Sequence, residues 1–285
     1  MWILFAAAPP PPTPPARAQV LVMGTAQALP PAAEALLGAQ DWPGLADWFE
    51  KAPPKLRRQH YEYWLQALNR SQRWARLAEA CKALTPQIEG RGKPRLGTYR
   101  LYRAQALSQL GRHQEALLAH AENGRLGQPE GYANACTEAR LAGNWPALLA
   151  HSDTILARKP DDAEALGWKG EALAHQKRFG ESAVILRKAV QINPKAAYAW
   201  NNLGRGALQQ KAWAEAKAAF DQALALEPGQ MEAHFNRGIA LFNLKQYAGS
   251  RDDFKAALAL RPGDPVLQEN LRQAEKMAAA YPQNP

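Results

Sequence analysis

The stretch AYAWNNLGRGALQQKAWAEAKAAFDQALALEP, residues 197–228, is the middle of three consecutive copies of one pattern. The flanking copies occupy residues 163–194 and 231–262, so the pattern recurs every 34 residues. Similar residues recur with this period at several positions of the pattern. They include Gly170, Gly204 and Gly238; Phe179, Trp213 and Tyr247; Ser182, Ala216 and Ser250; and Pro194, Pro228 and Pro262. Self-similarity at a fixed period of this length is typical of stacked repeat proteins.

Each copy predicts two antiparallel helices. In the middle copy Trp200, Leu203, Gly204 and Ala207 fall at i, i+3, i+4 and i+7, which is one face of a helix. A second helix opens at Trp213, and its predicted apolar face carries Ala216, Phe220, Ala223, Leu224 and Leu226. Glycine inside a helix costs about 1 kcal/mol relative to alanine. The recurring glycines therefore indicate that close packing of the two helices offsets this cost.

These copies resemble the tetratricopeptide repeat family, which implies an all-α, right-handed superhelical solenoid. The residue that opens the second helix recurs upstream as Trp42, Trp74, His113 and Trp145, which indicates about seven antiparallel helical hairpins. A single hairpin cannot bury its apolar face, so neighbours must stack. After Pro262, Asp264 and Pro265 start a last helix whose apolar stripe and polar opposite face are typical of a C-terminal capping helix.

The chain divides by pattern into five segments. These are an apolar and proline-rich segment outside the repeats (1–28), two divergent hairpins (29–86), a loop or hinge rich in turn formers (87–96), five hairpins (97–262), and the capping helix with its tail (263–285). The first segment is interpreted either as a signal-like leader or as the result of a mis-assigned start before Met23. A cytoplasmic location is favoured, and export is the alternative if this segment acts as a signal.

Composition and motifs argue against catalysis. The six histidines include no H-E-x-x-H pattern, and the chain contains no G-x-S-x-G or C-x-x-C. Cys81 and Cys136 have no metal-ligand spacing around them and are predicted to be buried apolar residues. No apolar run approaches the roughly 18 residues that a membrane span needs. We therefore expect a non-enzymatic protein with no metal, no cofactor and no transmembrane segment.

The resemblance implies that a partner peptide or helix lies on a concave surface lined by the first helices, here within residues 130–243. Ten residues are predicted to form this groove: Asn134, Trp168, Tyr198, Asn202, Arg205, Gln209, Phe235, Asn236, Phe242 and Asn243. An asparagine amide both donates and accepts, so it can pair with an extended backbone. The alternative is that these asparagines are tolerated polar residues on a solvated face. The family's clamp for C-terminal carboxylates is not predicted, because Gly167, Glu171, Glu232 and Asn236 stand at its positions.

A second candidate surface is basic. Between residues 55 and 103, twelve Lys and Arg residues stand against three Glu residues, a surplus equal to the formal net charge of the whole chain, +9. The residues assigned to this surface are Arg57, Arg58, Arg70, Arg73, Arg91, Lys93, Arg95, Arg100 and Arg103. Interleaved aromatic residues make nucleic acid, an acidic protein or an anionic membrane surface an alternative ligand. The same charges also suit a solvated face.

The sequence thus predicts a protein–protein interaction scaffold or adaptor whose partner it does not identify. The alternatives are the polyanion binder and a regulatory or assembly subunit of a larger complex.

Overall fold

The computed structural model describes residues 28–88, 93–128 and 130–282. Within these ranges the chain forms sixteen helices and no strand, so the predicted all-α fold is confirmed. The chain divides into two compact units between Asn144 and Trp145. We call the described parts the N-terminal unit (28–144) and the C-terminal unit (145–282). The proline-rich segment up to residue 27 and the centre of the predicted hinge lie outside the described residues.

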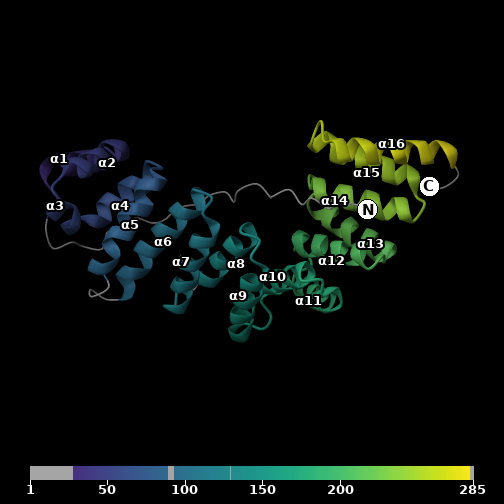
Figure 1. Cartoon of the computed structure of the whole chain (residues 1–285), viewed down its shortest axis with the longest axis horizontal. Coiled ribbons are helices and arrows are strands. Elements are labelled where there is room, and N and C mark those ends of the chain that lie inside the picture. The colour runs from purple at the N-terminus through teal and green to yellow at the C-terminus, as the bar shows by residue number, and fades with distance from the viewer. Residues whose placement is uncertain (1–27, 89–92, 129, 283–285) are drawn as a thin grey trace. The chain divides into compact units, whose positions relative to one another are not determined.

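The N-terminal unit consists of helices in sequential antiparallel pairs (Figure 1). They are α1 (Pro31–Gly38), α2 (Trp42–Lys51), α3 (Pro54–Gln59), α4 (Tyr61–Arg70), α5 (Trp74–Ile88), α6 (Lys93–Gln109), α7 (His113–Arg125) and α8 (Gly131–Leu141). Asp41 caps α2, because its Oδ1 accepts the Gly44 N–H at 2.9 Å.

Two features of this unit differ from the sequence prediction. Helix α3 is an additional short helix between the first two hairpins. The loop predicted at residues 87–96 is shorter, because α5 runs on to Ile88 and α6 begins at Lys93. Proline is tolerated in the first turn of a helix, where its missing N–H would have no partner, and Pro94 occupies such a place in α6.

The C-terminal unit contains the three regular copies. Its helices are α9 (Trp145–Arg158), α10 (Ala163–His175), α11 (Phe179–Ile192), α12 (Ala197–Gln209), α13 (Trp213–Leu226), α14 (Met231–Asn243), α15 (Tyr247–Leu260) and α16 (Pro265–Ala280). From α10 onward each helix packs against the next, and α12 also contacts α10 and α14 (Figure 1). The first helices of successive hairpins therefore lie beside one another.

The recurring glycines mark the crossings inside each hairpin. A Cβ at Gly204 would lie 2.7 Å from the Phe220 ring, and a Cβ at Gly238 would lie 2.7 Å from the Phe254 ring. In the last hairpin the Ser250 hydroxyl also donates to the Gly238 carbonyl at 2.8 Å. Each aromatic ring thus fills the space of the missing side chain, as the sequence predicts. Leu226 was assigned to the same apolar face but is 39% exposed, because it lies at the end of its helix.

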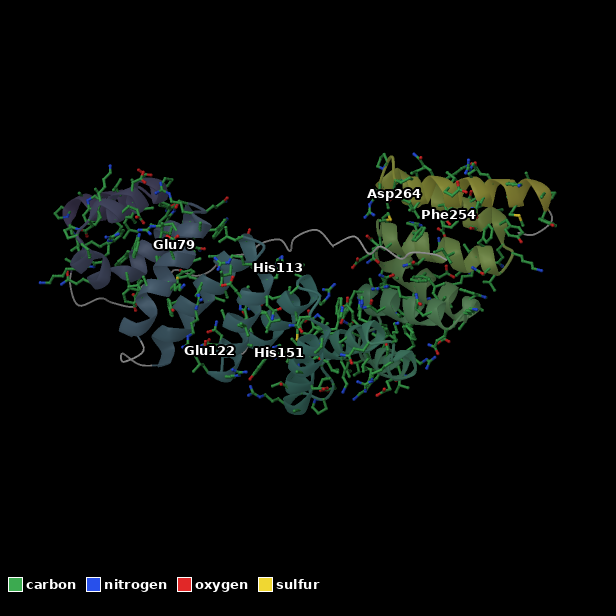
Figure 2. The ribbon with its side chains drawn as sticks, in the orientation of Figure 1. Glu79, His113, Glu122, His151, Phe254 and Asp264 are labelled. Carbon is green, nitrogen blue, oxygen red and sulfur yellow. The ribbon has the colours of Figure 1, made fainter. Side chains whose placement is uncertain are left out.

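Helix α16 closes the C-terminal unit as predicted. The Asp264 carboxylate accepts the backbone N–H groups of Val266 at 2.9 Å and Leu267 at 3.2 Å, which fixes the start of the helix (Figure 2). Leu267 and Ala274 are buried against the unit. The exposed residues on its outer side are Gln268, Arg272, Gln273, Glu275 and Lys276. A helix with one apolar and one polar face terminates a stacked core.

Candidate partner-binding groove

The first helices of the C-terminal unit carry the predicted groove residues with graded exposure. On α12, Asn202 is buried, Arg205 is half-buried and Gln209 is exposed. On α14, Asn236 is buried and Asn243 is exposed, with its Nδ2 donating to the Ile239 carbonyl at 2.8 Å. The stripe therefore becomes more accessible toward the C-terminal end of each first helix.

The asparagine column does not lie on a solvated face. Asn202 and Asn236 are only 6% and 5% exposed, and Trp168, in the same column of α10, is 5% exposed. The physical reason is that neighbouring first helices contact one another and cover this column. Arg205 Nη1 donates to Asn202 Oδ1 at 3.3 Å, whereas Asn236 Oδ1 is buried without a hydrogen-bond partner among the described residues. Trp168 therefore serves the packing between hairpins and is not an exposed anchor.

Tyr198 also has a packing role that the sequence did not indicate. Its hydroxyl donates to the Glu164 carbonyl on the preceding first helix at 2.9 Å. A Cβ at Gly167 would lie 1.6 Å from this hydroxyl oxygen, so only glycine leaves room for the tyrosine. The signal was present in the sequence as a glycine one hairpin upstream of an aromatic residue.

Three half-buried apolar side chains form a stripe on α14. Phe235, Ile239 and Phe242 stand at i, i+4 and i+7, which places them on one helix face. The Phe235 ring packs on Phe254 with centroids 5.9 Å apart, and the Phe242 ring meets Tyr247 edge-on at 5.3 Å. The two rings are thus held by the second helix and Ile239 packs on the neighbouring core, while part of each side chain remains accessible. We call these three residues the α14 stripe.

The asparagine column continues into α16. Asn270, on α16, lies 34 residues after Asn236 and is 4% exposed. Its Nδ2 donates to the Val266 carbonyl at 2.7 Å. The 34-residue period is enough to predict this position, although the sequence prediction for α16 was limited to a capping role. In the N-terminal unit, Asn134 on α8 is half-buried.

A charged cluster replaces apolar packing in the last hairpin. Arg237 stands where the middle copy has Leu203. Its guanidinium donates to Asp253 through Nε and Nη2, both at 2.7 Å, and to Asp221 through Nη1 at 2.8 Å. His234 Nδ1 lies 2.9 Å from Asp253 Oδ1. The hydrogen bonds to Asp253 raise the pKa of Arg237, and burial opposes them. These groups saturate one another and form no open site.

Most described residues of the basic surface already have partners in the N-terminal unit. Arg57 and Arg70 lie over the rings of Trp64 and Trp42, with guanidinium carbons 5.4 and 5.7 Å from the ring centroids. The remaining contacts are ion pairs, Arg73 with Asp47 at 2.5 Å and Arg100 with Glu122 at 2.7 Å. Arg103 is half-buried. The side chains of Arg58, Arg91, Lys93 and Arg95 lie outside the described set.

A second polar cluster lies between α7 and α8 in the N-terminal unit. His113 Nδ1 lies 2.9 Å from Glu138 Oε2, and the nearby His120 side chain is buried with no hydrogen-bond partner for Nδ1 among the described residues. Burial lowers the pKa of His120 below its usual 6.5, and the Glu138 carboxylate opposes this shift. His120 is therefore kept neutral in the folded protein.

We expect this histidine to make the N-terminal unit less stable in acid. Well above pH 6.5, His120 is neutral in both the folded and the unfolded chain. As the pH falls from 6.5 toward the lowered folded pKa, the unfolded chain binds the proton first, so the free energy of unfolding decreases. The loss is at most about 1.4 kcal/mol per pH unit, the limit for one proton. Urea unfolding at pH 7.5 and 5.5 should show a smaller loss for His120→Leu than for the wild type; equal losses would contradict this assignment.

Other chemistry has little support among the described residues. Both cysteines are buried, and burial raises the pKa of Cys81 to about 12, so its thiol is unreactive. The described residues include no group of three or more His, Cys, Asp or Glu side chains that could hold a metal ion. None of the described helices combines the length and the apolarity needed to cross a bilayer.

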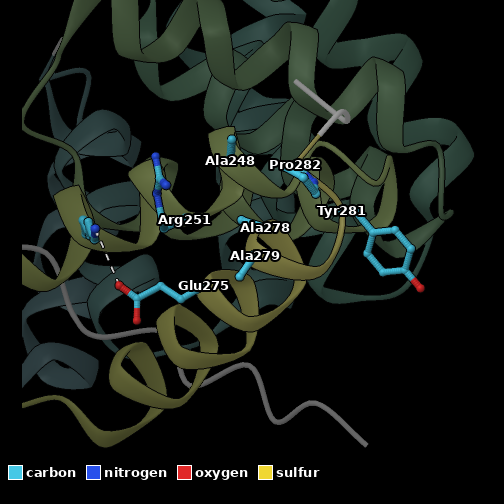
Figure 3. A pocket seen from close by; sticks show the side chains of 8 residues that line it. Ala248, Arg251, Glu275, Ala278, Ala279, Tyr281 and Pro282 are labelled. Atoms are coloured by element: carbon cyan, nitrogen blue, oxygen red, sulfur yellow. Dashed lines mark ion pairs between the residues drawn. The ribbon is translucent and has the colours of Figure 1, made fainter.

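A pocket of about 400 Å³ lies between α15 and α16 (Figure 3). Arg251, Lys255 and Glu275 contribute its charges. Lys255 Nζ lies 3.5 Å from Glu275 Oε1, and Arg251 pairs with Asp252 at 2.8 Å. Its cations are thus already paired with carboxylates of the same unit.

Comparisons with known proteins agree with this architecture. Residues 142–197 and 201–265 match the family model described as Tetratricopeptide repeat. The chain is similar to the APC/C hetero-tetramer Cut9–Hcn1, with 16% identity and a TM-score of 0.57 over 85% of this chain and 45% of that one. It is also similar to the MamA RS-1 ArsTM double mutant, with 19% identity and a TM-score of 0.51 over 60% of this chain and 97% of that one.

At these identities the likeness concerns the fold. No sequence among curated proteins matches the chain. The 34-residue period, the glycine–aromatic crossings within the hairpins and the matched family model lead to one conclusion. Residues 142–197 and 201–265 of this chain are tetratricopeptide repeats.

Proposed function

We propose that this protein is a protein–protein interaction scaffold, and that the C-terminal unit holds an extended segment of its partner along α12, α14 and α16. The tetratricopeptide repeats at residues 142–197 and 201–265 support a role in protein binding. The absence of any catalytic motif in the sequence is consistent with that role. The finer assignment, to a particular face, rests on the side chains of the C-terminal unit.

One observation carries the proposal, the half-exposed α14 stripe. At the equivalent positions α12 has Asn201, Arg205 and the buried Leu208, and α16 has Glu269, Gln273 and Lys276, so the accessible neighbours of the stripe are polar. An apolar strip held in place by core aromatics and flanked by polar groups has the composition of a binding hot spot with its rim. In this arrangement Phe235, Ile239 and Phe242 anchor an apolar side chain of the partner.

The flanking polar groups fix the register of the bound segment. Arg205 is half-buried and oriented by its hydrogen bond to Asn202, so it loses little conformational freedom on binding. Gln209 and Asn243 are exposed at the ends of their helices. Each amide offers one donor and one acceptor type to a peptide backbone. Asn202 and Asn236 are buried beneath this surface, so they do not contact the bound segment directly.

The test is a selection of extended peptides from a displayed random library, followed by affinity measurements with purified protein. We expect Phe242→Ala combined with Ile239→Ser to weaken selected peptides by at least about tenfold, the effect of losing one to two hot-spot contacts. Val184→Ser is the matched control, since Val184 is 64% exposed on α11, away from the stripe. Affinity for these peptides should change little with salt.

The proposal would be wrong if every selected peptide bound the double variant as tightly as the wild type. Circular dichroism and urea unfolding of each variant separate lost binding from lost folding. An Asn202→Ala/Asn236→Ala variant is a poorer probe, because both amides are buried and their removal also changes the packing.

A further inference from the structure

The turn inside each hairpin places one residue in the left-handed region of backbone space. Five of these residues are not glycine: Gln40, Gln72, Lys177, Lys211 and Lys245, with φ between 55° and 64°. The intervening hairpins use Gly111 and Gly143 at the same place. Glycine adopts this conformation without steric cost, whereas a side chain is disfavoured there. Lysine is thus a sterically poor choice that the chain makes in three successive hairpins.

These three lysines form a row of unpaired charge. Lys177, Lys211 and Lys245 recur every 34 residues in hairpins that stack in sequence, so they lie along one edge of the C-terminal unit. All three side chains are exposed. None makes an ion pair with another described residue. We call this edge the lysine rim.

The turns that carry the rim lysines contain no acidic residue. Residues 174–178, 208–212 and 242–246 include no Asp or Glu. The next acids along the chain in the first two turns are already engaged, Glu181 by Arg178 and Glu215 by Arg187. Gln209, Gln210 and Asn243 are exposed amides close to these lysines in the sequence. An anion at the rim therefore meets no carboxylate from the same turn.

We propose that the lysine rim binds an extended acidic protein segment, with about one carboxylate for each hairpin. Neighbouring packed helices lie about 8–10 Å apart. An extended chain advances about 3.3 Å per residue. The matching segment therefore carries Asp or Glu at about every third residue over three hairpins. The charges of the rim come from Lys177, Lys211 and Lys245, none of which belongs to the α14 stripe.

A protein segment fits this rim better than a nucleic acid does. Proteins that bind single-stranded nucleic acid combine a basic groove with aromatic side chains on which the bases stack. The aromatic residues next to the rim are buried or half-buried and are engaged within the unit: Trp213 packs against the hydrophobic core, and the Phe242 ring meets the Tyr247 ring at 5.3 Å. His175 is already stacked on Trp145, with ring centroids 3.6 Å apart.

The experiment compares two synthetic peptides and one oligonucleotide for binding to the full chain at low salt. The first peptide repeats Glu-Gly-Ser three times, and the second has the same composition with its three Glu residues adjacent. The oligonucleotide is a short single-stranded oligothymidylate. We expect the spaced peptide to bind most tightly, with affinity that falls as salt rises, because exposed charges are screened.

The decisive variant is Lys177→Gly/Lys211→Gly/Lys245→Gly. Glycine removes the three charges and relieves the left-handed strain, so the variant should unfold at a higher temperature while binding the spaced peptide about tenfold more weakly. Lys→Arg at the same positions should retain binding. Gln40→Gly/Gln72→Gly relieves the same strain without a change of charge and should leave binding unaltered.

A charge-matched control removes three exposed lysines of the N-terminal unit, Lys51, Lys55 and Lys82, by replacement with Gln. If this control weakens the peptide as much as the rim variant does, the anion site belongs to the basic surface and the rim proposal fails. It also fails if the glycine variant keeps full affinity, or if the oligonucleotide outcompetes the spaced peptide. Stripe variants test the proposed function separately, since Phe242→Ala/Ile239→Ser should leave this peptide's affinity unchanged.

Discussion

Replacing Phe254 by alanine should remove about 3–5 kcal/mol from the free energy of unfolding of the C-terminal unit. The ring is 1% exposed, lies against the backbone of Gly238 and packs on Phe235 (Figure 2). Its loss leaves a cavity at the crossing of α14 and α15. Urea unfolding followed by circular dichroism measures the cost, and Phe242→Ala, a half-buried ring of the same hairpin, should cost much less.

A second substitution makes this prediction specific to the crossing. Gly238→Ala alone should destabilise the protein by about 1–3 kcal/mol, because its Cβ would lie 2.7 Å from the Phe254 ring. In the Phe254→Ala background the same substitution should stabilise the protein, since the methyl group enters the cavity and alanine favours the helix. If Gly238→Ala changes the free energy of unfolding in the same direction in both backgrounds, the glycine is not required to make room for the Phe254 ring.

Arg237→Leu should be the next most costly change, at about 3 kcal/mol. Leucine is the residue of the middle copy at this position, so the loss does not arise from an unsuitable shape. It arises because Asp253, with a side chain 5% exposed, would keep its charge without the guanidinium. Asp221 is less affected, since Lys217 also pairs with it at 2.8 Å. Urea unfolding of the single variant measures this cost.

The double variant Arg237→Leu/Asp253→Ala reproduces the pair Leu203 and Ala219 of the middle hairpin. We expect it to recover most of the lost stability, because replacing a buried ion pair by apolar residues is often neutral or stabilising. If the double variant is no more stable than the single one, the charged cluster stabilises the fold by more than compensating the buried charge of Asp253.

The hairpin fold could be predicted because its signals are local and repeat. Gly204 and Phe220 lie within one copy. Gly238 and Phe254 make the same contact in the next copy, so the pattern is visible twice in the sequence. The buried state of Asn202 and Asn236 could not be predicted in the same way. It depends on how closely α10, α12 and α14 approach one another, which a pattern within a single helix does not encode.

The charged cluster shows a second limit. Arg237 could be recognised in the sequence as an exception in an apolar column, but its partners come from α13 and α15, 16 residues away on either side. Several surface cations at other positions are likewise satisfied by carboxylates from neighbouring helices. A count of charges along residues 55–103 therefore overstates what the basic surface can offer a ligand.

The polar outer side of α16 has a consequence for how such a protein changes length over evolutionary time. Gln268, Arg272 and Glu275 stand where α12 has Trp200, Gly204 and Ala207, so α16 has lost the surface that would accept a second helix. A duplicated 34-residue unit added beyond α16 would find nothing to pack against. One inserted between Pro262 and Asp264 would meet a complete hairpin before it and an unchanged terminating helix after it. New hairpins can therefore be inserted before α16 but not added after it. The number of hairpins can vary while the terminating helix stays the same.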